Sequence, residues 1–261
     1  MEPLKLVSIG EVMKGGTTKP VNIIALHNDE PTKYVMKVFT KSQITQGASV
    51  GKEIICNELA KQFDLNCPDY GIIEVDHNEF VGIYDEERIT KLDNGYKFCS
   101  KYLDGNAMFN PLVTNSFLKD YEVATIFAFD LLVYNSDRGG FRNKPNLLIN
   151  DNSLYLIDHE LTFPFIGEEI NNFNYENYLG NYPYKQHVLI RYLKSVRNKN
   201  DLFNEFIEML KVLNLNDLNI TFDFLEEFNI AHVERQKFMH YFAWAKNNVA
   251  IFDRYLKAMV Q

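Results

Sequence analysis

The residue pattern of this chain changes type near Asp104-Gly105, a dipeptide that is itself a turn signal. Before that point, short segments alternate apolar and polar residues and are rich in β-branched and aromatic side chains, which is typical of half-buried strands. After it, apolar residues recur mainly at helical spacing. This order favours an α+β fold with a bilobal plan. We predict a β-rich N-terminal lobe over residues 1–104 and a mainly helical C-terminal lobe over residues 105–261.

The elements expected in the N-terminal lobe are one helix and four strands. The helix covers residues 50–63, where Ile54, Ile55 and Leu59 recur at helical spacing. The expected strands are residues 4–9, 21–26, 33–39 and 70–75, of which the second and third form an antiparallel hairpin.

The C-terminal lobe is expected to begin with a long helix over residues 117–133. A hairpin follows, with strands 147–149 and 154–157 joined by an Asn-Asp-Asn-Ser turn. Residues 167–184 are predicted to be a surface loop, and residues 187–261 to form three or four helices. Aromatic residues make up 14% of the chain. We expect them mainly to pack helices and to hold rigid the loop that begins at Asn135.

Composition narrows the class of protein. The chain has 261 residues, of which 46% are hydrophobic and 24% charged, and this excludes extensive disorder. A net charge of −8 disfavours nucleic acid as the main partner, because phosphate binding needs clustered cations. No apolar run has membrane-span length, and residues 1–5 lack signal-peptide features. Cys56, Cys67 and Cys99 are dispersed and indicate free thiols, so we expect a cytoplasmic protein without membrane contact.

Three polar residues surround the predicted hairpin. Asp137 lies in a loop after a helix, Asn146 directly precedes the first strand, and Asp158 follows the second strand closely. Because the turn brings the outer strand ends together, Asn146 and Asp158 should lie close to each other, with Asp137 beside them. A carboxylate and an amide oxygen suit Mg²⁺, and a further carboxylate can accept a hydroxyl proton.

This ordered set is what phosphoryl transfer from ATP requires. Each residue taken alone is more often a turn cap, but the three in this order favour the catalytic interpretation. The N-terminal lobe contains candidates for binding the phosphates of ATP. Lys37 in a strand and Glu53 near the start of the next helix match the kinase ion pair that holds the phosphates, although alternation alone also allows an outward-facing lysine. The loop of Gly15, Gly16, Thr17 and Thr18 could close over phosphates through its backbone N–H groups.

The sequence resembles the HipA-like kinases, a branch of the protein-kinase-like fold that is related to phosphoinositide kinases, in their compact single-domain form. The segments that carry the resemblance are residues 15–20, 34–37, 52–60, 98–103, 129–138, 143–149 and 156–159. The resemblance implies that Lys37 binds the phosphates of ATP with Glu53, or alternatively Glu58, as its partner. It implies that Asp137 is the catalytic residue and that Asn146 and Asp158 hold Mg²⁺. It also implies a hinge at residues 98–103, where backbone groups of Lys101, Tyr102 and Leu103 meet adenine.

The chain departs from ordinary kinases in several ways. It has no G-x-G-x-x-G, H-R-D or D-F-G motif. Asn146 follows Asp137 by nine residues rather than the usual five, and Asn143 is the alternative metal ligand; we prefer Asn146 because a strand begins there. His159 is given no catalytic role. Arg138 and Arg142 could neutralise phosphate or pair locally with aspartate, and His187 and Tyr192 are interpreted as packing residues.

The leading hypothesis is an ATP- and Mg²⁺-dependent serine/threonine protein kinase with a toxin-like or regulatory role. It implies a protein substrate and, given the resemblance, a possible antitoxin partner. The alternatives are a small-molecule or lipid kinase and a nucleotide-binding pseudokinase without transfer activity; the long Asp137–Asn146 spacing motivates the last. Hydroxyl groups available for autophosphorylation are those of Ser42, Thr45 and Ser49.

Overall fold

The computed structural model describes residues 2–13, 18–139, 144–164 and 172–261 (side chains of 172–174 excepted). The N-terminal lobe contains a five-stranded antiparallel sheet in the spatial order β1-β2-β3-β5-β4. Its strands are β1 (Lys5–Val12), β2 (Val21–His27), β3 (Glu30–Lys37), β4 (Tyr70–Ile73) and β5 (Lys97–Lys101). All four strands expected from the sequence are present, and the fifth, β5, forms much of the segment expected to be the hinge.

The β2–β3 hairpin shows why these residues form strands. Val21, Ile23 and Ala25 are buried on one face of β2, and the residues between them are exposed. The connecting residues Asn28 and Asp29 both have positive φ, of 51° and 63°, as a two-residue hairpin turn needs. The strands pair in register from Val21 opposite Met36 to His27 opposite Glu30. The predicted hairpin is therefore confirmed.

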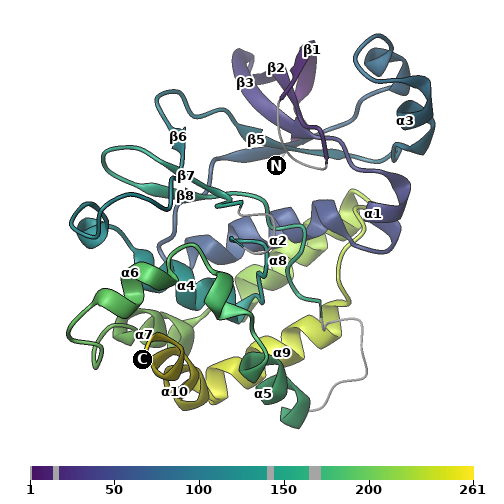
Figure 1. Cartoon of the computed structure of the whole chain (residues 1–261). Coiled ribbons are helices and arrows are strands. Elements are labelled where there is room, and N and C mark those ends of the chain that lie inside the picture. The colour runs from purple at the N-terminus through teal and green to yellow at the C-terminus, as the bar shows by residue number, and fades with distance from the viewer. Residues whose placement is uncertain (1, 14–17, 140–143, 165–171) are drawn as a thin grey trace.

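Helix α2 (Ser49–Lys61) lies between the sheet and the C-terminal helices (Figure 1). It follows the short helix α1 (Lys41–Thr45) and runs beside α8 (Leu215–Glu227), as Figure 1 shows. The Gln62 side chain exchanges hydrogen bonds with the backbone of Asn214, at 2.8 and 3.2 Å, which joins the end of α2 to the start of α8. Most α2 residues are buried, so this helix is enclosed by both lobes.

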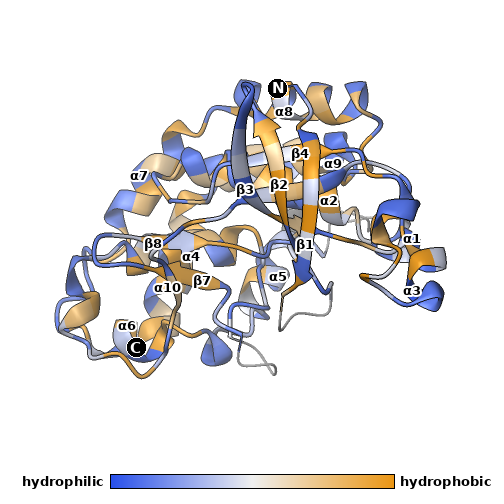
Figure 2. Cartoon of the chain, turned by 90° about the horizontal axis from the view of Figure 1, so that it is seen from above, coloured by the Kyte–Doolittle hydropathy of each residue, from blue (hydrophilic) through white to orange (hydrophobic). Residues whose placement is uncertain are grey.

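The C-terminal lobe is mainly helical, with a small three-stranded sheet. The strands are β6 (Ala107–Met108), β7 (Leu147–Ile149) and β8 (Leu154–Leu156), in the order β6-β7-β8. The remaining helical elements of the two lobes are η1 (His77–Phe80), α3 (Glu86–Lys91), η2 (Phe117–Asp120), α4 (Val123–Leu132), α5 (Asn172–Gly180), η3 (Tyr184–Gln186), α6 (Ile190–Ser195), α7 (Asn204–Val212), α9 (Arg235–Asn247) and α10 (Val249–Val260). Figure 2 shows hydrophobic residues along β1 and β2, and hydrophilic and hydrophobic residues alternating along α7 and α8.

Three expectations for the helical lobe were wrong. The helix expected over residues 117–133 is divided, because Tyr121 is extended (φ −109°, ψ 156°) and separates η2 from α4. The loop expected over residues 167–184 contains α5. Residues 187–261 form five α-helices rather than three or four, partly because Asn248 (φ −124°) ends α9 and separates it from α10.

The aromatic residues pack the core, as expected. Phe238, Tyr241 and Phe242 on α9 are buried, and Phe238 also contacts Phe222 of α8 edge-on. Tyr134 lies edge-on to Tyr178 and Tyr182, so aromatic rings support the start of the loop that begins at Asn135. The three cysteines form no disulfide. Within the described ranges, no helix is long and apolar enough to cross a membrane.

Candidate active site

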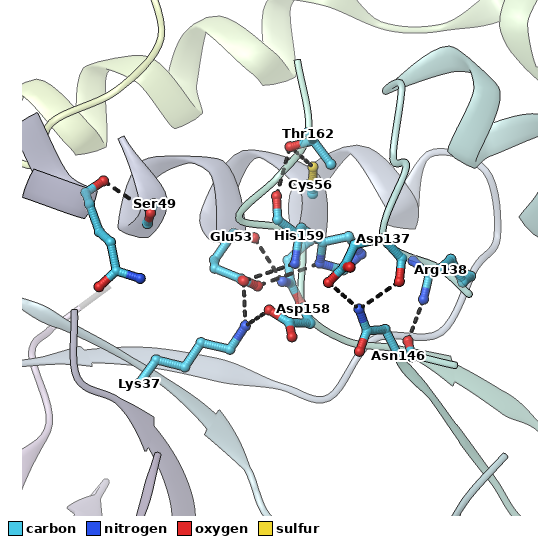
Figure 3. A network of polar contacts seen from close by, with 12 residues as sticks. Lys37, Ser49, Glu53, Cys56, Asp137, Arg138, Asn146, Asp158, His159 and Thr162 are labelled. Atoms are coloured by element: carbon cyan, nitrogen blue, oxygen red, sulfur yellow. Dashed lines mark hydrogen bonds and ion pairs between the residues drawn. The ribbon is translucent and has the colours of Figure 1, made fainter. Parts of the chain in front are cut away.

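Lys37, at the end of β3, joins the two lobes. Its Nζ donates to Glu53 Oε1 of α2 and, at 2.9 Å, to Asp158 Oδ1 after β8 (Figure 3). Lys37 is 9% exposed, so the outward-facing interpretation of this lysine is wrong. Burial alone would lower the pKa of Lys37, but the charges of Asp158 and Glu53 outweigh it and raise the pKa above its usual value. The ammonium group is therefore fixed in its charged form.

Glu53 is the carboxylate that reaches Lys37. It lies in the second turn of α2, with its side chain 1% exposed. Its Oε1 also accepts a hydrogen bond from the backbone N–H of His159 at 2.8 Å. Burial would raise the pKa of Glu53, but the charge of Lys37 outweighs this and holds the pKa below its usual range.

Glu58, the alternative partner, faces elsewhere. It accepts hydrogen bonds from Tyr70 at 2.8 Å and Lys61 at 2.6 Å, on a more exposed side of α2. The structure therefore places Glu53, and not Glu58, against Lys37.

Asp137 and Asn146 are brought together across the loop between them. Asn146 Nδ2 donates to both the backbone oxygen and Oδ2 of Asp137, each at 3.2 Å. Asn146 also accepts a hydrogen bond from Ile157 N at 3.2 Å, so Asp158 lies at the adjoining strand end, as Figure 3 shows. Asn146 and Asp158 have positive φ values of 47° and 65°, a conformation that Asn and Asp tolerate better than most residues.

The structure also gives a role to Asp130, which no sequence motif identifies. Asp130 is fully buried in α4, and its carboxylate contacts Asn135, Arg138 and His187. Burial would raise the pKa of Asp130, but the Arg138 charge and the hydrogen bond from His187 hold it below its usual value. The signal available in the sequence was a lone acid in an otherwise apolar helix. Arg138 pairs with this aspartate, which is the local alternative considered for it, and His187 does more than pack.

A cavity of about 480 Å³ opens beside Lys37. Apolar side chains that line it are Met13, Val35, Met108, Leu148 and Ile157. Its polar lining includes Thr18, Lys37, Lys144, Asn146 and Asp158. The expected hinge residues Lys101, Tyr102 and Leu103 also line the cavity.

Two of the hinge backbone amides donate hydrogen bonds within the protein. Lys101 N donates to Asp69 O at 2.7 Å, and Tyr102 N to Lys33 O at 2.9 Å. The amide of Leu103 has no backbone acceptor within the described part of the chain. This leaves it available as a donor to a molecule in the cavity.

The described end of the expected phosphate loop is anchored by Arg88 of α3 and by Tyr84, which lies just before that helix. Arg88 donates to Thr18 O and, at 3.3 Å, to Val38 O, and Tyr84 donates to Lys19 O. Thr18 is buried and lines the cavity. The predicted residues Gly15, Gly16, Thr17, Arg142 and Asn143 lie outside the described residues.

The donor set of Asn146 and Asp158 fits a hard divalent cation. Asn146 Nδ2 donates to Asp137, and no described residue donates a hydrogen bond to Asn146 Oδ1. The Asp158 side chain is 23% exposed, and one of its oxygens, Oδ1, accepts a hydrogen bond from Lys37. No group of three or more His, Cys, Asp or Glu side chains among the described residues could hold a metal, so further ligands would come from water and a phosphate.

Of the hydroxyl groups considered for autophosphorylation, Ser49 is buried and donates to Gln43 O at 3.0 Å. It is therefore less accessible than Ser42 and Thr45, which are exposed.

Among solved structures, the chain is similar to the crystal structure of the Helicobacter pylori proinflammatory kinase CtkA, with 12% identity and a TM-score of 0.46; the match covers 98% of this chain and 91% of that one. No curated protein sequence matches the chain. The family model described as HipA-like kinase matches residues 6–179, more than half of the chain. The chain therefore belongs to the HipA-like kinase family.

Proposed function

We propose that this kinase uses ATP and Mg²⁺ to phosphorylate a serine or threonine hydroxyl of a protein substrate. The observation that supports this best is the meeting of Lys37, Glu53 and Asp158 with the Asp137–Asn146 pair at one side of a cavity. Lys37 and Glu53 come from the N-terminal lobe, and Asp137, Asn146 and Asp158 come from the C-terminal lobe. Together they include the parts that phosphoryl transfer from ATP requires.

The proposed roles follow from the contacts. The apolar lining of the cavity takes adenine, and Leu103 N donates to the ring. Lys37 binds the phosphates, while Glu53 holds Lys37 in place. Asn146 and Asp158 would hold Mg²⁺, which neutralises phosphate charge when bound. Asp137 accepts or orients the proton of the attacking hydroxyl, so that catalysis rests on positioning and charge.

The contact between Asp137 and Asn146 favours transfer activity over a pseudokinase. The long spacing between these residues was the reason to consider an inactive protein. The extra residues do not separate the two side chains, because Asn146 Nδ2 lies 3.2 Å from Asp137 Oδ2. A longer loop is thus compatible with a catalytic carboxylate beside a metal ligand.

The test is transfer of label from γ-labelled ATP, with and without Mg²⁺, to the protein itself and to proteins of a cell lysate. We expect labelled serine or threonine in the parent protein or in a discrete lysate protein. Asp137→Asn should abolish labelling but keep the thermal stabilisation by Mg-ATP. Stabilisation without labelling would instead indicate a pseudokinase, and labelling of small molecules alone would indicate a metabolite kinase.

A toxin-like or regulatory role with an antitoxin partner is proposed from the resemblance alone. Growth arrest on expression of the parent, but not of Asp137→Asn, would support it. Relief of that arrest by the product of an adjacent gene would identify the partner.

A further inference from the structure

Asp130 occupies a position that is unfavourable for a carboxylate. It lies in the last turn of α4, whose other residues are mostly apolar, and it is fully buried. A negative charge is disfavoured at the C-terminal end of a helix, and burying a charge is costly unless it is paired. Local helix stability therefore does not explain this residue.

One oxygen of Asp130 leads to the catalytic aspartate. Asn135 Nδ2 donates to Asp130 Oδ1 at 3.1 Å, and the other side of the same amide, Oδ1, accepts from Asp137 N at 3.2 Å. Asn135 is 1% exposed, so water does not compete for these contacts. The amide of Asn135 thus transmits the position of Asp130 to the backbone of Asp137.

The other oxygen leads to the expected metal ligand. Arg138 Nε donates to Asp130 Oδ2, and Arg138 Nη1 donates to the backbone oxygen of Asn146 (Figure 3 shows the second contact). The Arg138 side chain is 0% exposed. One guanidinium therefore links α4 to Asn146, the residue that directly precedes β7.

His187 contacts the same carboxylate from the tail of the chain. Its Nε2 donates to Asp130 Oδ2 at 2.9 Å, while its Nδ1 accepts from Leu189 N at 3.2 Å. His187 does not connect Asp130 to Asp137 or Asn146. Its hydrogen bond is the second one that Asp130 Oδ2 accepts, after that from Arg138.

We propose that Asp130 is a positioning residue that fixes Asp137 through Asn135 and Asn146 through Arg138. This inference rests on the proposed function, because it assigns a purpose to the placement of those two side chains. It also accounts for the long spacing. A nine-residue separation is compatible with a 3.2 Å contact because both ends are tied to one buried carboxylate.

The Asn135 branch (Asp130 to Asp137 through Asn135) and the Arg138 branch (Asp130 to Asn146 through Arg138) are tested separately with the full chain. Asn135→Ala releases the Asp137 backbone, and we expect kcat to fall about 10- to 100-fold with the Mg²⁺ requirement unchanged. Arg138→Lys keeps the charge but shortens the reach to Asn146, and we expect the Mg²⁺ concentration for half-maximal activity to rise about 10-fold. Asp130→Asn should show both effects if it folds; if it does not fold, the two branch variants decide.

Tyr241→Phe is the matched control. Tyr241 donates to Leu132 O at 2.6 Å, so this change removes a buried hydrogen bond at the end of the same helix without altering the contacts of Asp130. We expect it to lower the melting temperature and to leave kcat and the Mg²⁺ requirement unchanged at temperatures well below melting. Equal kinetic losses in the control and the branch variants would overturn the proposal, and so would branch variants that match the parent.

Failure of the inference and failure of the proposed function can be told apart. If the parent transfers no phosphoryl group, the proposed function fails. The Arg138 branch can still be assessed from the Mg²⁺ dependence of binding of a non-hydrolysable ATP analogue. Unchanged Mg²⁺ dependence in Arg138→Lys would then overturn that branch, and a shift of about 10-fold would support it.

Discussion

The carboxylate of Glu53 accepts a hydrogen bond from the backbone N–H of His159 at 2.8 Å, although 106 residues separate them in the chain. The same oxygen accepts from Lys37. Because Asp158 also contacts Lys37, the end of β3, helix α2 and the segment after β8 form one closed set of contacts. The two lobes are thereby joined at the residues proposed to bind nucleotide and metal.

The first prediction concerns the stability of this set. Lys37→Met leaves Glu53 buried without its cation, and breaking a buried pair in this way costs about 3–5 kcal/mol of unfolding free energy. Urea unfolding without nucleotide measures the loss. The control is Lys61→Met, whose partner Glu58 is at a more exposed site and whose loss should stay under about 1 kcal/mol. Similar losses in both variants would show that the Lys37 pair adds no more than a surface ion pair.

Much of this arrangement could be predicted because each residue adjoins a recognisable element. Asn146 was preferred over Asn143 because a strand was expected to begin there, and the strand and the contact with Asp137 are present. The side chain direction of Lys37 could not be derived from alternation. It lies at the end of β3, where α2 covers it, and a neighbouring helix is a tertiary feature that local periodicity does not contain.

The missed features depended on long-range packing. Helix α5 is rich in Asn and Tyr and has no clear apolar periodicity, so its sequence matched a loop. The partners of Asp130 include His187, 57 residues away, and local spacing does not predict such a contact. The isolated acid of α4 was visible in the sequence, but its partners were not.

The second prediction tests the packing of α2 against the C-terminal lobe. A Cβ at Gly51 would lie 2.5 Å from Ala231 O and 3.0 Å from His232 Cα, both backbone atoms. Gly51→Ala should therefore destabilise the protein by about 1–3 kcal/mol in urea unfolding. It should also lower phosphoryl transfer, because Glu53 lies on the same helix. Gly180→Ala, whose Cβ has no neighbour closer than 3.4 Å, should be neutral or slightly stabilising.

The third prediction concerns pH. Burial lowers the pKa of His187 below its usual value of 6.5, and the hydrogen bond to Asp130 only partly offsets this. Between the lowered pKa and 6.5, the unfolded chain binds a proton that the folded chain does not. The contribution of His187 to the unfolding free energy is therefore fully present above about pH 6.5. It decreases as the pH falls below that value, by up to about 1.4 kcal/mol per pH unit.

Glu160 has the opposite effect on the pH dependence of stability, because burial and the charge of Asp158 raise its pKa to about 7. Its contribution to the unfolding free energy grows as the pH falls from about 7 towards 4.5, the pKa of this carboxyl in the unfolded chain. The total pH dependence therefore combines both groups, and the difference between the parent and His187→Gln isolates the histidine. We expect that difference in urea unfolding free energy to shrink from about pH 8 to about pH 5. A constant difference would contradict the assignment.

The fourth prediction concerns the phosphate loop. Arg88 donates to the backbone oxygens of Thr18 and of Val38, the residue directly after β3, so its loss should free the described end of that loop. Hydrogen bonds from a charged group contribute about 1.5–3 kcal/mol, and we expect Arg88→Ala to weaken ATP binding about 10-fold with a smaller effect on kcat. Calorimetric titration with Mg-ATP measures the affinity. Lys91→Ala changes an exposed cation on the same helix, paired only with Glu87 among the described residues, and should bind ATP like the parent. If both variants bind like the parent, the loop is held in place without Arg88, and the anchor serves stability alone.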